Sequence, residues 1–168
     1  MSAGSIDSQV VRQLLESGDY TITSLAAAMG VSKQTISYHA QKAGWRSPLA
    51  VAREQIPWSN MPSEAKAATP YQRLVQHLEY VAAGDKFLGE GIRSRLRNWY
   101  VNTLMEFSVV VEYDPDQPPT PNQKFGYWRY VPRVAADGEL ILRRNEHTEL
   151  TPEQEVWFQM PERLPEPR

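Results

Sequence analysis

The sequence predicts an α+β protein with an N-terminal three-helix domain and a second domain of mixed helices and strands. Apolar residues recur at helical spacing in three short stretches of residues 1–52, and this period is the main signal for helices. After residue 70, two helical stripes precede runs rich in β-branched and aromatic residues, which are typical of strands. We expect domains at residues 1–52 and 70–160. The proline-interrupted residues 53–69 would form a linker, and residues 161–168 a flexible tail.

The first domain is predicted to hold three short helices. The first covers about residues 6–17. Thr23 or Ser24 can cap the second helix, which ends at Gly30 because glycine readily adopts the left-handed conformation of a helix end. Ser32 can cap a third helix that runs to about Ala43.

The second domain is predicted to hold two helices, a small antiparallel sheet of about three strands and a short C-terminal helix. The helical stripes run from Tyr71 to Val81 and from Ile92 to Phe107. The predicted strands cover residues 107–113, 125–134 and 139–145. Asp137-Gly138 is a strong signal for a hairpin between the last two strands. Thr151-Pro152 marks the start of the final helix.

Composition and charge narrow the class of protein. A hydrophobic fraction of 41% and a net charge of −2 are ordinary for a globular chain of 168 residues. The chain has no cysteine, which rules out disulfides and thiolate zinc sites. It starts without a signal peptide and has no apolar run near the ~20 residues of a membrane span, so we expect a cytoplasmic protein. Residues 1–52 carry four basic and three acidic side chains, whereas residues 112–168 carry seven basic and eleven acidic side chains.

Residues 22–39 match the requirements of a helix-turn-helix. Ala26 supplies the small residue at the helix crossing, and Gly30 suits a turn that needs positive φ. Apolar residues that would hold both helices on the first helix are also present, at Leu25, Met29, Val31 and Ile36. The competing interpretation is a three-helix bundle whose polar face has no partner or binds a protein.

If this motif binds DNA, its second helix enters the major groove with its N-terminal residues at the base edges. The candidate base-reading residues are Ser32, Lys33, Gln34, Ser37 and Tyr38. Gln34 can pair bidentately with adenine, and Lys33 can donate to guanine or to phosphate. The candidate contacts to the DNA backbone are Thr21, Thr23, Thr35, Lys42 and Arg46. His39 suits either packing on the first helix or a phosphate contact.

A second group of candidate DNA contacts lies at the start of the second domain, at Lys86, Arg93, Arg95, Arg97 and Asn98. On a helix, Arg93 and Arg97 flank one side of the apolar stripe and Arg95 flanks the other. This polar face could rest on a phosphate backbone, or it could only keep the helix soluble. The sequence leaves both interpretations open.

The predicted hairpin interleaves arginines with aromatic residues. With a two-residue loop at Asp137-Gly138, one face carries Arg129, Arg133 and Arg144, a candidate nucleic-acid surface. The other face carries Trp128, Tyr130, Val134 and Ile141, which we expect to be core. A register slip of one residue would exchange the two faces.

The sequence offers no catalytic or metal-binding set. His39, His77 and His147 have no partner at metal-ligand spacing, and the chain has no glycine-rich phosphate loop or nucleophile elbow. We therefore expect no enzymatic activity, no metal and no cofactor.

Taken together, these segments resemble the immunity repressors of temperate mycobacteriophages that bind operator-like stoperator sites. The resemblance covers about residues 6–160. It rests on AAAMGVSKQTISYHAQKAGW, IPW, YQRLVQHLEYVAAGD, RLRNWY followed by VVVEYDP, YWRYVPR and ILRRNEHTELTPEQ. The first of these segments is generic among phage and bacterial regulators, and those of the second domain are more distinctive.

The resemblance implies a double-stranded DNA-binding repressor in the cytoplasm of the host bacterium. Such proteins silence an early lytic promoter, occupy many short asymmetric sites and make the host immune to related phages. It also implies DNA contact by the second domain and a monomer on each site, because symmetric helix-turn-helix dimers read palindromes. The alternative is a ligand-responsive or dimeric regulator whose second domain is a sensor or dimerisation module. A DNA-processing enzyme fused to the motif is a third hypothesis, which the missing catalytic set disfavours.

Overall fold

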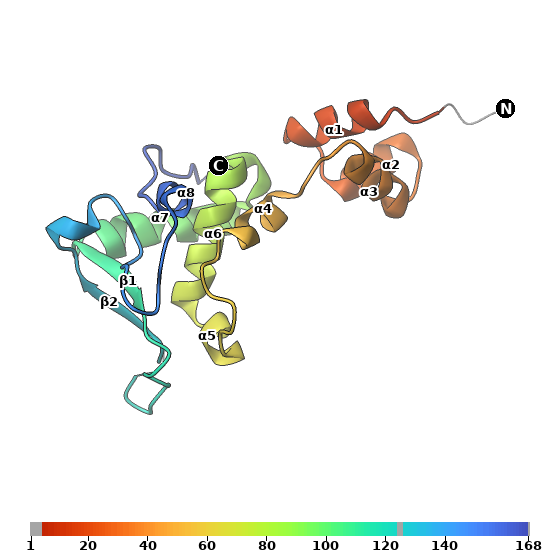
Figure 1. Ribbon diagram of the computed structural model, residues 1–168. Coiled ribbons are helices and arrows are strands. Elements are labelled where there is room, and N and C mark those ends of the chain that lie inside the picture. Colours follow the sequence, from red (N-terminus) through yellow and green to blue (C-terminus); the bar gives the residue numbers. More distant parts are fainter. Residues whose placement is uncertain (1–4, 124–125, 168) are drawn as a thin grey trace. The chain divides into compact units, whose positions relative to one another are not determined.

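The computed structural model describes residues 5–123 and 126–167 and divides the chain into two compact units, Met1–Ala50 and Val51–Arg168 (Figure 1). It mixes helices with one small sheet, as the α+β prediction required. Among the described residues, no helix has both the length and the apolar character needed to cross a membrane.

The first unit is a cluster of three short helices around an apolar centre. The helices are α1 (Ser8–Glu16), α2 (Ile22–Met29) and α3 (Lys33–Lys42), and α3 packs on both of the others. They bury one continuous set of side chains, consisting of Val11, Leu15, Leu25, Ala26, Ile36 and Ala40. The helical periodicity of the sequence therefore gave the right number of helices and most of the buried residues. The expectation that Met29 holds α2 on the first helix is wrong, because its side chain is 39% exposed.

The helix ends of the first unit depend on a few side chains. Ser32 caps α3 as predicted, and its hydroxyl accepts a hydrogen bond from the backbone N–H of Thr35. The predicted cap of α2 at Thr23 or Ser24 is wrong. Thr21 is the cap, because its hydroxyl and that of Ser24 form a reciprocal capping box that starts the helix at Ile22. Gly30 ends α2 with a φ of 67°.

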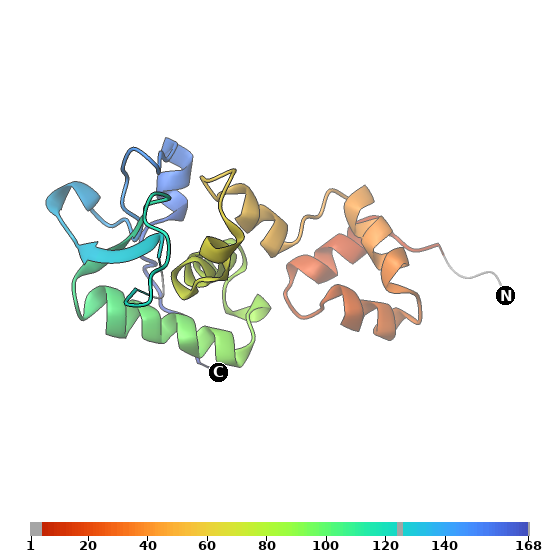
Figure 2. The ribbon, with the colours of Figure 1, turned by 90° about the horizontal axis from the view of Figure 1, so that it is seen from below.

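The second unit contains most of the remaining helices. They are α5 (Ser63–Ala67), α6 (Thr69–Ala83), α7 (Glu90–Trp99) and α8 (Pro152–Trp157), with a short 3-10 turn η1 (Asp85–Phe87) between α6 and α7. A helix α4 (Pro48–Glu54) crosses the division between the units. Figure 2 shows that α7 continues directly into η2 (Tyr100–Met105), which has π-helical hydrogen bonding. Phe107 was expected to continue the apolar stripe, but it lies beyond η2 and is 70% exposed.

The sheet has two strands, not the three expected. Strand β1 (Val109–Tyr113) pairs antiparallel with β2 (Trp128–Pro132), so that Val111 faces Tyr130. The third predicted strand, residues 139–145, makes only isolated bridges: a parallel one between Leu142 and Val111 of β1, and antiparallel ones from Leu140 to Gln159 and from Asn145 to Thr148. Phe125, the predicted start of the second strand, lies outside the described residues.

The predicted hairpin at Asp137-Gly138 is wrong because the side chain of Asp137 forms hydrogen bonds that close a different turn. Its carboxylate accepts a hydrogen bond from the backbone N–H of Val134 and two from Arg143. These bonds close a 3-10 turn, η3 (Ala135–Asp137). The chain after Gly138 then runs beside β1 instead of β2. The predicted faces survive in part, since Trp128 and Ile141 are buried, but Val134 is 51% exposed.

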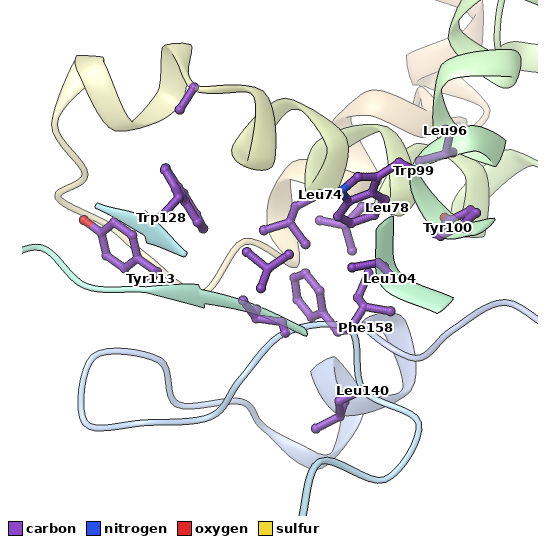
Figure 3. Packing of buried hydrophobic residues seen from close by; sticks show 14 of the residues in the cluster. Leu74, Leu78, Leu96, Trp99, Tyr100, Leu104, Tyr113, Trp128, Leu140 and Phe158 are labelled. Carbon is purple, nitrogen blue, oxygen red and sulfur yellow. The ribbon is translucent and has the colours of Figure 1, made fainter. Parts of the chain in front are cut away.

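The core of the second unit lies between α6, α7, the sheet and the C-terminal segment (Figure 3). Leu74 and Leu78 of α6, Leu96 of α7 and Phe158 at the end of α8 all belong to this buried cluster. Residues 53–69, expected as a linker, contribute to this core. Within them, Trp58 packs edge-on against Trp128 and donates from Nε1 to the Thr148 hydroxyl at 3.0 Å.

The C-terminal residues 161–167, expected as part of a flexible tail, also pack against this unit. The Tyr80 hydroxyl donates to the backbone oxygen of Arg163 at 2.6 Å. Arg97 donates to the backbone oxygen of Pro165 at 3.1 Å, and Leu164 packs on the core. The proline-rich composition of this segment suggested disorder, but hydrogen bonds and apolar contacts hold it in place.

Candidate DNA interface

The exposed face of α3 brings together most of the predicted base-reading residues. Lys33, Gln34, Ser37 and Tyr38 line one shallow surface hollow together with Gln41. Gln34 is exposed, and Tyr38 is 61% exposed. Ile36 and Ala40 of the same helix are fully buried, so that the apolar side of α3 fixes the direction of its polar side. Neither Gln34 nor Tyr38 is covered by other described parts of the protein.

Some predicted DNA contacts also have structural partners. The hydroxyls of Ser32 and Thr35 lie 2.8 Å apart and share the cap of α3. Thr21 forms the capping box of α2, which leaves Thr23 as an exposed hydroxyl in the first turn. At the other end of α3, the Lys42 ammonium lies 6.0 Å from the centre of the Tyr38 ring, within the range of a cation–π contact. Arg46 is exposed beyond the helix.

His39 packs toward the first helix, one of the two possibilities that the sequence left open. Its Nδ1 lies 2.7 Å from the hydroxyl of Ser8 on α1. Arg12 of α1 also donates to the backbone oxygen of Ala43, at 2.8 Å. These two contacts attach the C-terminal end of α3 to α1 and, with the buried Ile36 and Ala40, fix the direction of its exposed face.

Sequence reasoning missed two features of this surface. Gln41 lies on the same face as Ser37, four residues earlier, and helical spacing alone would have included it. The chain also has no Asp or Glu from Tyr20 to Arg53, a stretch of 34 residues. Because no carboxylate opposes Lys33, Lys42 and Arg46 within this stretch, the local charge is positive although the whole chain is acidic.

The arginines predicted for a hairpin face are held by partners within the second unit. Arg129 lies 2.7 Å from the Glu112 carboxylate and Arg144 lies 2.7 Å from that of Glu155. Arg133 donates to the backbone oxygen of Gly138. Since the predicted hairpin does not form, these three residues do not share one strand-pair face.

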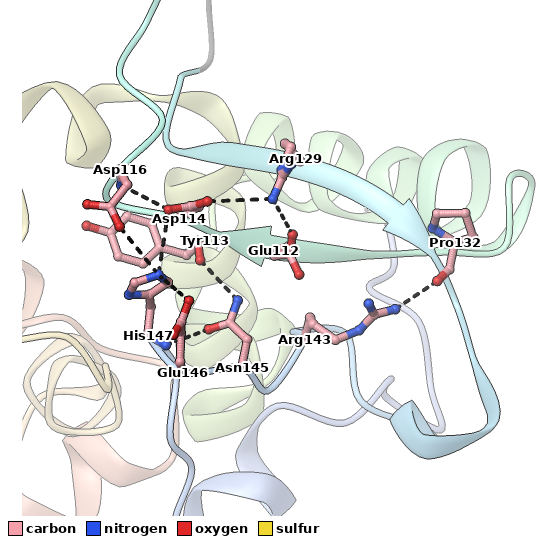
Figure 4. A network of polar contacts seen from close by, with 10 residues as sticks. All are labelled: Glu112, Tyr113, Asp114, Asp116, Arg129, Pro132, Arg143, Asn145, Glu146 and His147. Atoms are coloured by element: carbon pink, nitrogen blue, oxygen red, sulfur yellow. Dashed lines mark hydrogen bonds and ion pairs between the residues drawn. The ribbon is translucent and has the colours of Figure 1, made fainter.

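The surface around Arg129 is acidic (Figure 4). Arg129 also approaches Asp114, and His147 Nε2 lies 3.3 Å from Glu146 and within 3.8 Å of Asp114 and Asp116. The prediction that His147 has no partner at metal spacing is wrong, because ligand atoms of Asp114, Asp116 and His147 lie within 4.8 Å of one another. The turn at residues 145–148 brings them together. Two carboxylates beside Arg129 and two more beside His147 make this edge a poor surface for a polyanion.

The candidates on α7 and η1 are placed differently. Arg97 points to the C-terminal segment, and the half-buried Arg93 has an Nε with no hydrogen-bond partner. Arg95 and Asn98 lie on the other side of α7 and line a groove with Arg73 of α6. Lys86 is exposed on η1. Sequence reasoning missed Arg73, since nothing in the sequence shows that it lies near Arg95.

The comparisons with known proteins give one clear relative. No family model matches the chain. The repressor-like immunity protein of Mycobacterium phage L5 is 33% identical to it over 146 residues, which is 86% of this chain and 79% of that protein. The chain belongs to the mycobacteriophage immunity repressors. This confirms the resemblance that the sequence segments predicted.

Membership in the immunity repressors applies to both units. The matched 146 residues exceed the 118 residues of the second unit, Val51–Arg168, so the similarity also extends into the helical first unit. A repressor's regulatory role also agrees with the non-enzymatic role expected from the sequence.

Proposed function

We propose that this immunity repressor is a sequence-specific, double-stranded DNA-binding transcriptional repressor that maintains lysogeny and superinfection immunity. The observation that carries the proposal is the exposed polar face of α3 on a closed apolar core. The two helices α2 and α3, joined at Gly30 in the left-handed conformation, then act as a helix-turn-helix. The relative from phage L5 is named as a repressor-like immunity protein, which supports the same role.

In this proposal, α3 lies in the major groove with its N-terminal turns toward the bases. Gln34 is exposed and can make the bidentate pair with adenine N6 and N7. Lys33 can donate to guanine acceptors, while Ser37 and Tyr38 reach neighbouring positions on the same face. Each good bidentate contact contributes about 1–3 kcal/mol of discrimination between bases.

Contacts to the DNA backbone set the register of α3. Thr23 and the N–H groups at the start of α2 can donate to phosphate, because helix N-termini favour anions. Lys42 and Arg46 supply positive charge at the far end of α3. The hydroxyls of Thr21, Ser32 and Thr35 are committed to caps, so their role is to fix the donors around them.

One recognition helix makes few base contacts, so a monomer needs a second anchor on the same duplex. We infer that the second unit provides it and that the repressor binds short asymmetric sites as a monomer. Two unlike surfaces on one chain suit an asymmetric site, whereas a symmetric dimer suits a palindrome.

The test compares the full chain with residues 1–50 on duplexes selected by the full chain from a random-sequence pool. We expect the full chain to bind more tightly and with a steeper dependence on salt, because more phosphates are neutralised. Sedimentation of the complex should show one chain per site. Binding of the short fragment as tight as that of the full chain, with the same salt slope, would show that the second unit does not bind DNA.

A further inference from the structure

The groove between the start of α6, the α7–η2 helix and β2 is lined by hydrogen-bond donors and lacks carboxylates. Its volume is 350 Å³, and its lining includes Thr69, Arg73, Arg95, Asn98, Asn102 and Tyr130. These residues come from three separate parts of the chain that the fold of the second unit brings together. A groove of this composition is suited to an anion.

The two guanidinium groups in this groove repel each other without any compensating acid. Partial burial, followed by the positive charge of Arg95, lowers the pKa of Arg73. Among the residues that the structure describes, no carboxylate lies within ion-pair distance of either arginine. The arginines of β2 and of the segment after η3 differ, since Arg129, Arg143 and Arg144 each have an acidic partner. An anion bound between them would offset the repulsion between Arg73 and Arg95.

Several neutral donors around the pair are also available. In the described part of the chain, the side chains of Asn98 and Asn102 make no hydrogen bond. The Tyr130 hydroxyl accepts from the buried Trp99 Nε1 at 2.8 Å, and its own proton has no acceptor among the described groups. The Gln76 amide oxygen accepts from Arg73 at 3.0 Å, which limits the movement of that guanidinium. Arg73 and Tyr130 are therefore oriented before any ligand arrives, and Asn98 and Asn102 have free donors to offer it.

The extent of the groove favours a polyanion over a single phosphate. Arg95, Asn98 and Asn102 follow one another along α7 and η2, a span of about 10 Å at the rise of a helix. Consecutive phosphates of a nucleic-acid strand present anionic oxygens over such a length, and most protein–DNA hydrogen bonds go to phosphate and sugar.

We propose that the Arg73–Arg95 groove is the surface by which the second unit holds the sugar-phosphate backbone of duplex DNA. The inference rests on the proposed function and adds to it the residues and the class of contact. It assigns the DNA contact to α6, α7 and η2, and not to Arg129, Arg133 and Arg144 of the predicted hairpin. Because phosphate contacts carry no direct sequence information, the groove adds affinity to every site and leaves base choice to α3.

The experiment uses full-length Arg73→Gln, Arg95→Gln and the double variant, with Arg163→Gln as the matched control. Arg163 is 76% exposed, lies in the same unit and takes part only in long ion pairs of 3.9 Å. Binding to a duplex selected by the wild-type chain and to a random-sequence duplex is measured at several salt concentrations. We expect each groove variant to lose about tenfold in affinity for both duplexes, and the salt slope to fall by about one per lost phosphate contact.

Two further readouts separate binding from folding. Arg95→Lys keeps the charge and should retain the wild-type salt slope. Arg73→Gln removes a like-charge repulsion, so its melting temperature should equal or exceed that of the wild type. A groove variant that melts lower and binds more weakly in proportion would point to a structural role and overturn the inference.

The remaining outcomes are distinct. Groove variants that bind like the wild type, or a control that loses as much affinity, would overturn the groove and leave the repressor function standing. A loss confined to the selected duplex would make the groove a base reader, which also contradicts the proposal. A wild-type chain that binds no duplex would refute the proposed function itself.

Discussion

The described residues of the first unit bury only apolar side chains, whereas the second unit also buries His77, Asp137 and Thr148. The three helices of the first unit need no polar partner inside, and helix caps satisfy their ends. The second unit joins segments far apart in the chain through hydrogen bonds to its buried polar groups. Such bonds stabilise only while both partners keep the right protonation state and geometry, so the two units should respond differently to acid and to mutation.

His77 shows how this works in the second unit. Its Nδ1 lies 2.6 Å from the Tyr100 hydroxyl and its Nε2 lies 2.8 Å from the backbone oxygen of Trp157. In the neutral tautomer with the proton on Nε2, the ring donates to Trp157 and accepts from Tyr100. Burial, opposed by the bond to Trp157, lowers the pKa of His77 to about 4. One uncharged ring thus connects α6 to η2 and to α8.

The largest expected effect is that of Asp137→Ala. This carboxylate is nearly buried and holds Arg143 through two bonds of 2.8 and 2.9 Å. Although burial raises the pKa of Asp137, the bonds from Arg143 and Val134 lower it on balance. Removing it leaves Arg143 without its acidic partner, although Arg143 still donates to the backbone oxygen of Pro132, and should lower the free energy of unfolding of the second unit by about 4 kcal/mol.

Urea unfolding followed by amide NMR signals of each unit measures this effect. Asp116→Ala is the control, since its side chain is 81% exposed, and it should change stability by less than about 0.5 kcal/mol. Equal losses of stability in both units, or equal losses for Asp137→Ala and Asp116→Ala, would contradict the proposed difference between the two units.

The next effect is the acid sensitivity of the second unit. The folded pKa of His77, about 4, lies below its ordinary value of 6.5, so the unfolded chain binds a proton first as the pH falls. Stability from the neutral ring is complete above pH 6.5 and declines toward pH 4, by about 3 kcal/mol in total. His77→Gln should remove this part of the pH dependence. If the same decline persists in that variant, another group is responsible.

The same contrast explains what could be predicted from the sequence. Apolar spacing predicted α1, α2 and α3 and most of their buried residues, because a helix face is set by neighbours three and four residues away. The exposed face of α3 followed directly. In the second unit, the Asp137-Gly138 signal was overridden because Arg143 recruits the Asp137 carboxylate, and no local rule includes that contact.

Long-range partners account for the other differences. His77 bonds to a residue 80 positions away, and Arg73 lines a groove with Arg95, 22 positions further along the chain. The C-terminal segment looked disordered by composition, but Tyr80 and Arg97 bind its backbone. Each of these contacts depends on the completed fold, so a single sequence gives no signal for it.

A third prediction concerns recognition by the first unit. Gln34 is exposed, and its side chain makes no hydrogen bond among the described residues, so Gln34→Ala should leave stability unchanged. It should cost about 2 kcal/mol of discrimination at one base pair, by loss of a bidentate contact. Binding to single-base variants of the selected duplex measures this loss. Gln13→Ala, on the exposed side of α1, is the control. A uniform loss over all duplexes would assign Gln34 to the backbone instead.

The smallest expected effect compares one glycine from each unit. Gly30 has a φ of 67° and open space around the position of a Cβ, so Gly30→Ala introduces no clash but strains the backbone. It should destabilise the first unit by about 1 kcal/mol.

Gly91 lies within α7 with ordinary helical φ and equally open space. Gly91→Ala should therefore stabilise the second unit by about 0.5 kcal/mol, because alanine loses less backbone entropy. Thermal unfolding with unit-specific NMR signals measures both. The added methyl group has the same open space at the two sites, so only the backbone conformation differs between them. Stability changes of opposite sign would show that backbone conformation makes the turn between α2 and α3 require glycine. Changes of the same sign would show that it does not.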